Sequence, residues 1–564
     1  MSQARYLAKL ASVLSAEGVI PTSKGGTGNT TGAGGGTTVY ATLSLLPLSN
    51  VTAGSMAYVT ENNRLYLWTG TGWYNIALIN NNPTITSGPN ASYTLSTTGV
   101  ATVITLAAND PEGLPVTWSY TGTPGNVATV SQANNVFTIT PSTSGSDSGT
   151  FNLTFIASDG VNLASASSNF SLQFTVNWST VSLQTDLRSP NQNTAVSGYF
   201  GQGVSISGNT AVVGAFLEDT SNVGRVYVFN RAGSTWTTQA TLTRPAEITS
   251  QLGWGGSAAI DGDTIVAGAQ NLTVSGQGGA GAVYVFTRSG TTWTQQQKLT
   301  ASDPTLNVNF GSGVDISGDT IVVGAGTAGN GAAYVFTRSG TIWTQQQKLT
   351  ASDGVSGDNF GTEAVAIVGN TIIVGAKSNN GSRGAAYVFT RSGTTWTQQQ
   401  KLTAGDGAAN DNFGRSVAID PAGTTVACGS LFNDAGGSNA GAVYVFTVSG
   451  STWSQQTKLI GPGTDYWLGG KVALGTNILV AAADWATVGV SNSGQVYRYT
   501  RTGTTWSSAS TLATGGIASE RVGSGGLDIS NNTIIVGASS FRTSTAAGSN
   551  GSVGRALVYA AGYV

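Results

Sequence analysis

Two acidic pairs and four aromatic residues are the parts of this chain whose types and spacing could do chemistry. Asp353 and Asp358 precede one Asn-Phe-Gly phrase, and Asp406 and Asp411 precede another. Carboxylate oxygens are ligands for Ca²⁺, so each pair is a weak candidate for a metal site. Aspartate in a surface loop also forms turns by bonding to the nearby backbone. We favour the turn, and we expect no resident metal and no cofactor.

Four aromatic residues interrupt the regular pattern described below and are candidates for contact with a receptor: Trp254, Tyr466, Trp467 and Trp485. Trp254 and Trp467 stand near Leu252 and Leu468, which occupy positions where other parts of the chain have Phe. In one interpretation, which we favour, the large ring fills the volume that Leu leaves empty. In the other, the ring is exposed and stacks on a sugar.

Composition argues against an enzyme. The chain has no histidine and one cysteine, Cys428. The commonest general base, every Ser/His or Cys/His nucleophile pair and any cysteine-rich zinc site are therefore missing. The acids are scattered among hairpin turns at equivalent repeat positions, whereas acid–base catalysis needs them to converge in a pocket. Cys428 replaces a repeated Val, and we expect it to be a small buried hydrophobic residue.

Length, charge and hydropathy limit the remaining classes. A chain of 564 residues is expected to form several domains. The formal charge of −2 provides no basic face for nucleic acid. No segment approaches the roughly 20 apolar residues of a membrane span, so we expect no membrane insertion. The 79 glycines and only 9% charged residues favour short strands joined by tight turns.

The candidate residues must be positioned by a repeat that occurs seven times. A Phe-Gly phrase or its variant starts at Phe200, Leu252, Phe310, Phe360, Phe413, Leu468 and Val522. A period near 50 residues is typical of a propeller or another array. In the third copy, "SGVDIS" and "TIVVGA" flank a Gly-Asp turn and predict a two-residue hairpin. "GAAYVFTRSGTIWTQQQKLTA" adds two strands, and four antiparallel strands without a helix predict a propeller blade.

The end of the array predicts how it closes. Six copies finish with a strand that carries a Trp and then a Leu, and the seventh copy lacks it. A similar segment, "WSTVSLQTDL" at 178–187, precedes the first copy with Trp178 and Leu183 at nearly the same spacing. We expect this strand to complete the seventh blade and close the ring. Closure also removes exposed sheet edges, which would otherwise pair with other molecules.

The repeated phrase resembles a known family. "TIVVGA" after Phe-Gly, followed by "GAVYVF", resembles the FG-GAP repeat of integrin-alpha-type seven-bladed propellers, over residues 177–564. The resemblance implies that fold and a binding surface. Some blades of the family carry a calcium loop of the D-x-D-x-D-G type between the first two strands. Here that hairpin is usually Gly-Asp or Gly-Asn, so the resemblance does not imply the metal.

Four segments precede the expected propeller. Residues 1–19 have Leu7, Leu10 and Leu14 at helical spacing and predict an amphipathic helix for anchoring or oligomerisation, too short to be stable alone. Residues 20–38 form a Gly/Thr-rich linker, and residues 39–81 a small β-module. Strands in 82–176 have the spacing of a β-sandwich that resembles cadherin-like or immunoglobulin-like modules. The expected fold class is all-β throughout the rest of the chain.

The N-terminal motifs suggest a biological context. "SKGGTG" and the module at 39–81 resemble segments of tailed-phage virion proteins, notably those of phages that infect marine cyanobacteria. The resemblance implies a virion tail fibre or tip adhesin, made in the host cytoplasm without a signal peptide. Its expected partners are tail or baseplate proteins at the N-terminus, further copies of itself in a trimer, and a host surface glycan or protein. The alternatives are a structural decoration protein of the virion, a secreted bacterial adhesin and a polysaccharide depolymerase.

Overall fold

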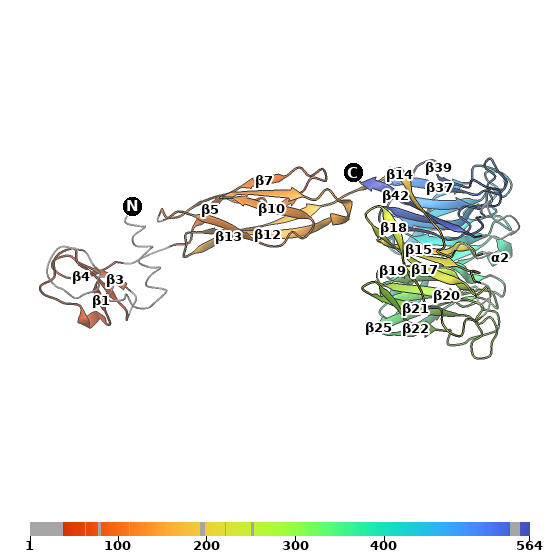
Figure 1. Cartoon of the computed structure of the whole chain (residues 1–564), viewed down its shortest axis with the longest axis horizontal. Coiled ribbons are helices and arrows are strands. Elements are labelled where there is room, and N and C mark those ends of the chain that lie inside the picture. Colours follow the sequence, from red (N-terminus) through yellow and green to blue (C-terminus); the bar gives the residue numbers. More distant parts are fainter. Residues whose placement is uncertain are drawn as a thin grey trace. The chain divides into compact units, whose positions relative to one another are not determined.

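The structure, a computed structural model, describes residues 38–61, 64–76, 81–111, 113–191, 198–219, 222–249, 253–541 and 553–563. The helix expected at 1–19 and nearly all of the linker at 20–38 lie outside the described residues. The chain divides into two compact units, Met1–Thr175 and Val176–Tyr563. The described residues are almost all β, as predicted (Figure 1). No helix among them is long and apolar enough to cross a membrane.

The first unit begins with a small four-stranded sheet in which the strands follow one another in chain order. Its strands are β1 (Thr38–Tyr40), β2 (Met56–Val59), β3 (Arg64–Trp68) and β4 (Trp73–Ile76), with the 3-10 turn η2 (Leu43–Leu45) between the first two. β1 pairs with β2 in parallel and the other pairs are antiparallel. Ala57, Val59 and Tyr66 form its small core with Leu46.

Residues 84–172 of the same unit form two larger sheets and a short strand pair. The strands are β5 (Thr84–Ser87), β6 (Ser92–Thr94), β7 (Thr102–Thr105), β8 (Ala107–Asn109), β9 (Thr117–Thr121), β10 (Ala128–Ala133), β11 (Val136–Pro141), β12 (Gly149–Ser158) and β13 (Leu163–Leu172), with the turn η3 (Gly145–Asp147). The sheet orders are β10-β11-β7, β6-β13-β12-β9 and β5-β8. Both larger sheets contribute to one core, in which Phe137 lies edge-on to Phe155.

The second unit contains seven sheets, which we number in chain order. Sheet 1 has β15 (Phe200–Ser207), β16 (Thr210–Ala215), β17 (Arg225–Ala232) and β18 (Thr235–Thr241). Sheet 2 has β19 (Trp254–Asp261), β20 (Thr264–Ala269), β21 (Ala282–Ser289) and β22 (Thr292–Leu299). Sheet 3 has β23 (Val314–Ser317), β24 (Thr320–Ala325), β25 (Ala332–Ser339) and β26 (Ile342–Leu349). Sheet 4 has β27 (Phe360–Val368), β28 (Thr371–Ala376), β29 (Ala385–Ser392) and β30 (Thr395–Leu402), with the short helix α2 (Asn379–Ser382) after β28.

The last three sheets vary this plan. Sheet 5 has β31 (Phe413–Ile419), β32 (Thr425–Ser430), β33 (Ala442–Ser449) and β34 (Thr452–Ile460). Sheet 6 has β35 (Leu468–Gly475), β36 (Ile478–Ala483), β37 (Gln495–Thr502) and a fourth strand split into β38 (Thr505–Trp506) and β39 (Ser510–Thr514). Sheet 7 has β40 (Leu527–Ser530), β41 (Thr533–Ala538), β42 (Arg555–Tyr563) and, from the start of the unit, β14 (Val176–Leu187).

Strand β14 lies where the sequence placed a closing strand, at the outer edge of sheet 7. It pairs antiparallel with β42, from Val176 opposite Tyr563 to Leu187 opposite Ala556. Two register shifts interrupt the pairing. Because of them, the buried residues of the strand are not the expected Trp and Leu pair. Trp178 is buried as expected, but Leu183 is half exposed and Leu187 fills the core instead. The extra residues of the bulges turn the later side chains to the opposite face.

The seven sheets pack in a ring. The first strand of each sheet contacts the first strands of both neighbouring sheets, and β15 of sheet 1 contacts β40 and β41 of sheet 7. The first strands therefore line the inside of the ring, and the fourth strands lie at its outer edge. Glycine allows the sheets to approach: a Cβ on Gly324 would lie 2.0 Å from the carbonyl oxygen of Gly361 in the next sheet. No larger residue fits that contact without movement of the backbone.

A repeated set of side chains holds the outer strands together. Trp396 of sheet 4 is buried, and its indole N–H donates to Gln346 Oε1 of sheet 3 at 2.8 Å. The neighbouring Gln347 accepts from the Trp396 backbone N–H and donates to its carbonyl oxygen. The guanidinium of Arg391 lies 5.1 Å from the centroid of the same ring. Equivalent Trp–Gln contacts join sheets 2 to 3 and 4 to 5, so these tryptophans are structural.

The two ends of the ring differ in construction. At one end, which we call the hairpin end, short turns join the first strand to the second and the third to the fourth. Gly262 and Gly318 begin two such turns with φ of +54° and +55°, a conformation that favours glycine. At the other end, which we call the loop end, longer segments join the second strand to the third and each sheet to the next. Variation in sequence and length therefore concentrates at the loop end.

Candidate functional site

A group of charged side chains lies at the loop end on the inside of the ring. Glu363, Arg415 and Lys471 come from the first strands of sheets 4, 5 and 6, shortly after the Phe-Gly or Leu-Gly phrase. Arg415 Nη1 lies 2.6 Å from Glu363 Oε2, and Lys471 Nζ lies 3.8 Å from the same oxygen. Lys377, which follows β28, also interacts electrostatically with Glu363 and Arg415. We call these four residues the inner charged cluster.

The pKa values of the cluster reflect its excess of cations. Burial alone would raise the pKa of Glu363, but Lys471 and Arg415 lower it to about 2. Burial lowers the pKa of Lys377 and of Lys471, and Arg415 lowers both further. Glu363 partly offsets that effect. The carboxylate is therefore ionised at neutral pH, and the two ammonium groups lie in a site with more positive than negative charge.

An aromatic stack borders this cluster. The ring of Trp467 lies 4.5 Å from Trp485 and meets Phe432 edge-on at 5.0 Å. The guanidinium of Arg521 lies 4.6 Å from the Trp485 ring and is ion-paired with Asp484. Asp484 also interacts with Arg415 and Lys471, so it connects the stack to the inner charged cluster.

Packing in the stack limits how far its tryptophan rings are open to a ligand. All three rings are half-buried, and Trp485 contacts both Trp467 and the Arg521 guanidinium. The indole nitrogens of Trp467 and Trp485 are buried and have no hydrogen-bond partner among the described residues. Tyr466, the third candidate here, is half-buried and packs against the core of sheet 6. These residues form a rigid wall rather than a set of separate open platforms.

Trp254 corrects two expectations. Its ring is fully buried, so the interpretation as an exposed sugar-stacking residue is wrong. It pairs with Ala269 just as Phe360 pairs with Ala376, and its ring meets Tyr284 edge-on at 5.6 Å. In sheet 2, Trp254-Gly255 therefore occupies the position that Phe-Gly has in the other sheets. The expected start of this copy at Leu252 is wrong. Leu252 itself lies outside the described residues.

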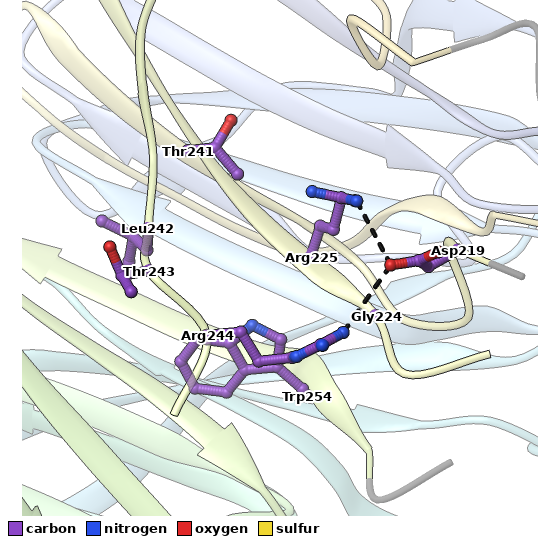
Figure 2. A pocket seen from close by; sticks show the side chains of 8 residues that line it. All are labelled: Asp219, Gly224, Arg225, Thr241, Leu242, Thr243, Arg244 and Trp254. Atoms are coloured by element: carbon purple, nitrogen blue, oxygen red, sulfur yellow. Dashed lines mark hydrogen bonds and ion pairs between the residues drawn. The ribbon is translucent and has the colours of Figure 1, made fainter. Parts of the chain in front are cut away.

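A cavity of about 300 Å³ lies at the loop end between sheets 1 and 2 (Figure 2). Arg225 and Arg244 converge on one carboxylate oxygen of Asp219, at 3.2 and 3.6 Å. Thr241, Thr243 and Trp254 contribute to the wall. The volume is at the lower end of the range for small-molecule sites. Two cations to one anion make it suited to a small polar or acidic group.

The acids considered as weak metal candidates are engaged within the protein. Asp353 accepts from the Tyr387 hydroxyl and is ion-paired with Lys401, and the same arrangement joins Asp406 to Tyr444 and Lys458. Asp358 accepts from Asn379, and Asp411 from Asn433; both also accept from a backbone N–H of their own loop. No group of acids, histidines and cysteines suited to a metal ion occurs among the described residues.

The sequence-based interpretation missed the inner charged cluster. The signal was present in the phrase itself: "FGSG" in sheet 3 becomes "FGTE", "FGRS" and "LGGK" in sheets 4, 5 and 6. Charged residues thus replace Ser or Gly at positions that the repeat makes equivalent. Each appears in one copy only, and the three do not share one sign, so no single copy draws attention to them. Their proximity depends on the packing of consecutive first strands.

Comparison with known proteins agrees with the repeat structure. No curated protein matches the chain. The FG-GAP repeat matches four segments, residues 192–229, 293–336, 343–389 and 396–446. Three of these begin at the Trp of a fourth strand and end in the third strand of the next sheet, so the matched segment crosses the sheet boundary. The second unit therefore contains FG-GAP repeats.

Proposed function

We propose that the chain is a non-enzymatic recognition protein whose seven sheets form a seven-bladed β-propeller that binds a cell-surface glycan or protein at its loop end. One observation carries the proposal: the frame repeats from sheet to sheet, and the departures from the repeat gather at the loop end. The inner charged cluster, the aromatic stack and the cavity of Figure 2 all lie there. A frame that repeats while one surface varies is typical of recognition scaffolds.

Recognition is favoured over catalysis by the state of the loop-end acids. Glu363, Asp353, Asp406 and Asp484 are each ion-paired with Arg or Lys. Glycoside hydrolysis by the usual route needs two carboxyl groups that face the substrate across a cleft. Acids that are neutralised by fixed partners are better suited to holding loops and binding groups in place.

The context is part of the same proposal. We place the protein on the virion of a tailed phage as a tail fibre or tip adhesin, attached to tail or baseplate proteins through residues 1–38 and assembled as a trimer. The support is the resemblance of the linker and of the module at 39–81 to phage virion proteins. The sheets of residues 84–172, proposed as an immunoglobulin-like or cadherin-like sandwich, would act as a spacer.

A blocking experiment tests which end binds. Cys428 is fully buried, so a cysteine introduced at the surface can be coupled selectively to a maleimide-linked polymer. Ala409→Cys places the polymer in a loop between sheets 4 and 5 at the loop end, and Thr341→Cys places it in a turn of sheet 3 at the hairpin end. Both positions are exposed.

The labelled full chain is then tested against bacterial cells, cyanobacteria included, and against their purified surface polysaccharides. We expect the polymer at position 409 to abolish binding and the polymer at position 341 to leave it unchanged. Equal inhibition from both ends would contradict the proposal. Binding to no cell or polysaccharide would favour a decoration protein, and release of oligosaccharides would favour a depolymerase.

A further inference from the structure

We infer that the inner charged cluster is a binding site for the carboxylate or sulfate groups of an acidic glycan. This inference rests on the proposed function and specifies its ligand class. The site consists of Lys377, Arg415 and Lys471 around Glu363, at the loop end on the inside of the ring. The aromatic stack of Phe432, Trp467 and Trp485 forms the wall beside it.

The geometry leaves cationic groups with unused binding capacity. Arg415 and Lys471 both approach the same Glu363 oxygen, at 2.6 and 3.8 Å. Lys471 is ion-paired with Glu363, but at 3.8 Å the contact is longer than an ordinary hydrogen bond, so the ammonium can bond another acceptor more closely. The ammonium of Lys377 forms no hydrogen bond with any described residue. An ammonium has three donors, and a half-buried one gains by bonding an anion.

The charge balance points to an anionic ligand. Three cations surround one carboxylate, which leaves a net charge of +2 (three positive minus one negative). Asp484 also interacts with Arg415 and Lys471, but its own ion pair with Arg521 cancels its charge. A chain with a formal charge of −2 therefore gathers positive charge at one point. Like charges brought together in a partly desolvated site cost free energy that a bound anion would recover.

The frame does not require these charges. In sheet 3 the equivalent positions are Ser312 and Gly313, and that sheet packs in the same ring. Glu363 also has a backbone φ of +63°, a left-handed conformation that is rare for a residue other than glycine. The β-bulge between Phe360 and Val365 accounts for this conformation. The cluster is therefore a local addition to the frame.

An acidic sugar fits both parts of this surface. Its carboxylate or sulfate would bond Lys377, Arg415 and Lys471, and its ring would lie against the edge of the aromatic stack. Asp484 and Arg521 are the remaining charged groups at this boundary, and Asp484 interacts with both Arg415 and Lys471. A neutral sugar would leave the cations unpaired. A nucleic acid would also supply anions, but its long phosphate backbone is normally matched by an extended basic surface, whereas this chain has a formal charge of −2.

The test uses the full chain and three matched variants. Lys377→Gln/Lys471→Gln removes both ammonium groups of the cluster, and Glu363→Gln removes the internal competitor. Lys348→Gln, which breaks an exposed ion pair with Asp303, is the control. The probes are oligogalacturonate, dextran sulfate, neutral dextran and single-stranded DNA, with binding measured by calorimetry at about 0.15 M salt. Near-UV circular dichroism confirms that each variant is folded.

We expect oligogalacturonate or dextran sulfate to bind the native chain and neutral dextran not to bind. The double Lys variant should lose at least about tenfold in affinity, Glu363→Gln should bind more tightly, and Lys348→Gln should be unchanged. Unchanged affinity in the double variant, or DNA binding as tight as that of the acidic sugars, would overturn the inference. If the double variant loses the acidic sugars but still binds cells, the ligand class is wrong and the proposed function stands. If the native chain binds acidic sugars but no cell, the proposed function fails alone.

Discussion

The two ends of the ring place carboxylates in opposite electrostatic surroundings. On the first strand of sheet 3 near the hairpin end, Asp315 accepts from the backbone N–H groups of Ile316 and Ile367, at 2.8 Å each. Its pKa is raised to about 7, mainly by burial. At the loop end, burial acts on Glu363 in the same direction, but Lys471 and Arg415 overcome it and lower the pKa to about 2.

The difference shows how the two ends divide their roles. At the hairpin end, carboxylates and hydroxyls join the first strands through backbone donors: Asp528 accepts from Ile206, and Ser205 accepts from Ile260 in the next sheet. Such contacts fix the spacing of sheets, and the ion pairs at this end, Arg288 with Asp263 and Arg338 with Asp319, each lie within one sheet. At the loop end, charged side chains pair with one another across three sheets. Backbone contacts suit a frame, whereas side-chain charges are available to a ligand.

The largest expected effect is on stability. It comes from comparing the truncation of one Trp in the frame with the truncation of one Trp at the loop end. Trp396→Ala should lower the free energy of unfolding by about 3–5 kcal/mol, because it empties a buried site and leaves Gln346 without its donor. Trp485→Ala, in the half-buried stack, should cost about 1–2 kcal/mol. Chemical denaturation of the full chain measures both. Equal losses would mean that the stack belongs to the frame.

Close approach of the sheets gives the second prediction. Gly324→Ala should cost about 3 kcal/mol or more, since the new methyl would lie 2.0 Å from the Gly361 carbonyl oxygen. Gly340→Ala, in an open turn with φ of +62°, should cost about 1–2 kcal/mol from backbone strain alone. Thermal unfolding of the two variants compares them. A milder effect at position 324 would show that the sheets can shift apart.

Opposite pH dependences provide the third prediction. Because the pKa of Asp315 is raised in the folded state, its protonated form is favoured there, and its contribution to stability falls as pH rises from about 4 through 7. Asp315→Asn should flatten that part of the stability profile. Because the pKa of Glu363 is lowered, its contribution is present above about pH 4.5 and is lost as pH falls toward 2. Glu363→Gln should remove that acid-side loss.

Melting temperatures of the native chain and both variants between about pH 2 and 8 provide the measurement. Subtracting each variant's melting temperatures from those of the native chain gives the pH-dependent contribution of one carboxylate at a time. If both variants change the same side of the profile, the two ends do not differ as described.

The smallest expected effects concern single polar contacts. Gln347→Ala removes two hydrogen bonds to the Trp396 backbone and should cost about 1–2 kcal/mol. Ser352→Ala, at the exposed loop end, removes a side-chain hydrogen bond that Gln398 donates, and it should lower the free energy of unfolding by only a few tenths of a kcal/mol. Urea titrations resolve the first and set a limit on the second. A larger loss of stability from Ser352→Ala would show that the loops contribute to the structural frame.

Much of the frame followed from local sequence pattern. Alternating apolar residues around Gly-Asp or Gly-Asn predicted the hairpins, and the repeated Trp marked each fourth strand. The turn chemistry and the strand period act over a few residues, so a short segment specifies them. The closing strand could also be placed, because "WSTVSLQTDL" resembles the strand that the last copy lacks. The sequence could not predict which Leu of this strand enters the core. The bulges that expose Leu183 and bury Leu187 depend on the pairing with β42.

The sequence by itself determined the repeat, the all-β character and the absence of histidine chemistry, because these depend on residue types and local spacing. Only the tertiary structure decided that Trp254 occupies a Phe position in the core, and that Glu363, Arg415 and Lys471 meet although they lie about 50 residues apart along the chain. Packing of consecutive sheets brings the third and fourth residues of the repeated phrase together, so a charge that looks isolated in one repeat gains its partners from the next two. Long-range contact, rather than any local motif, creates the site.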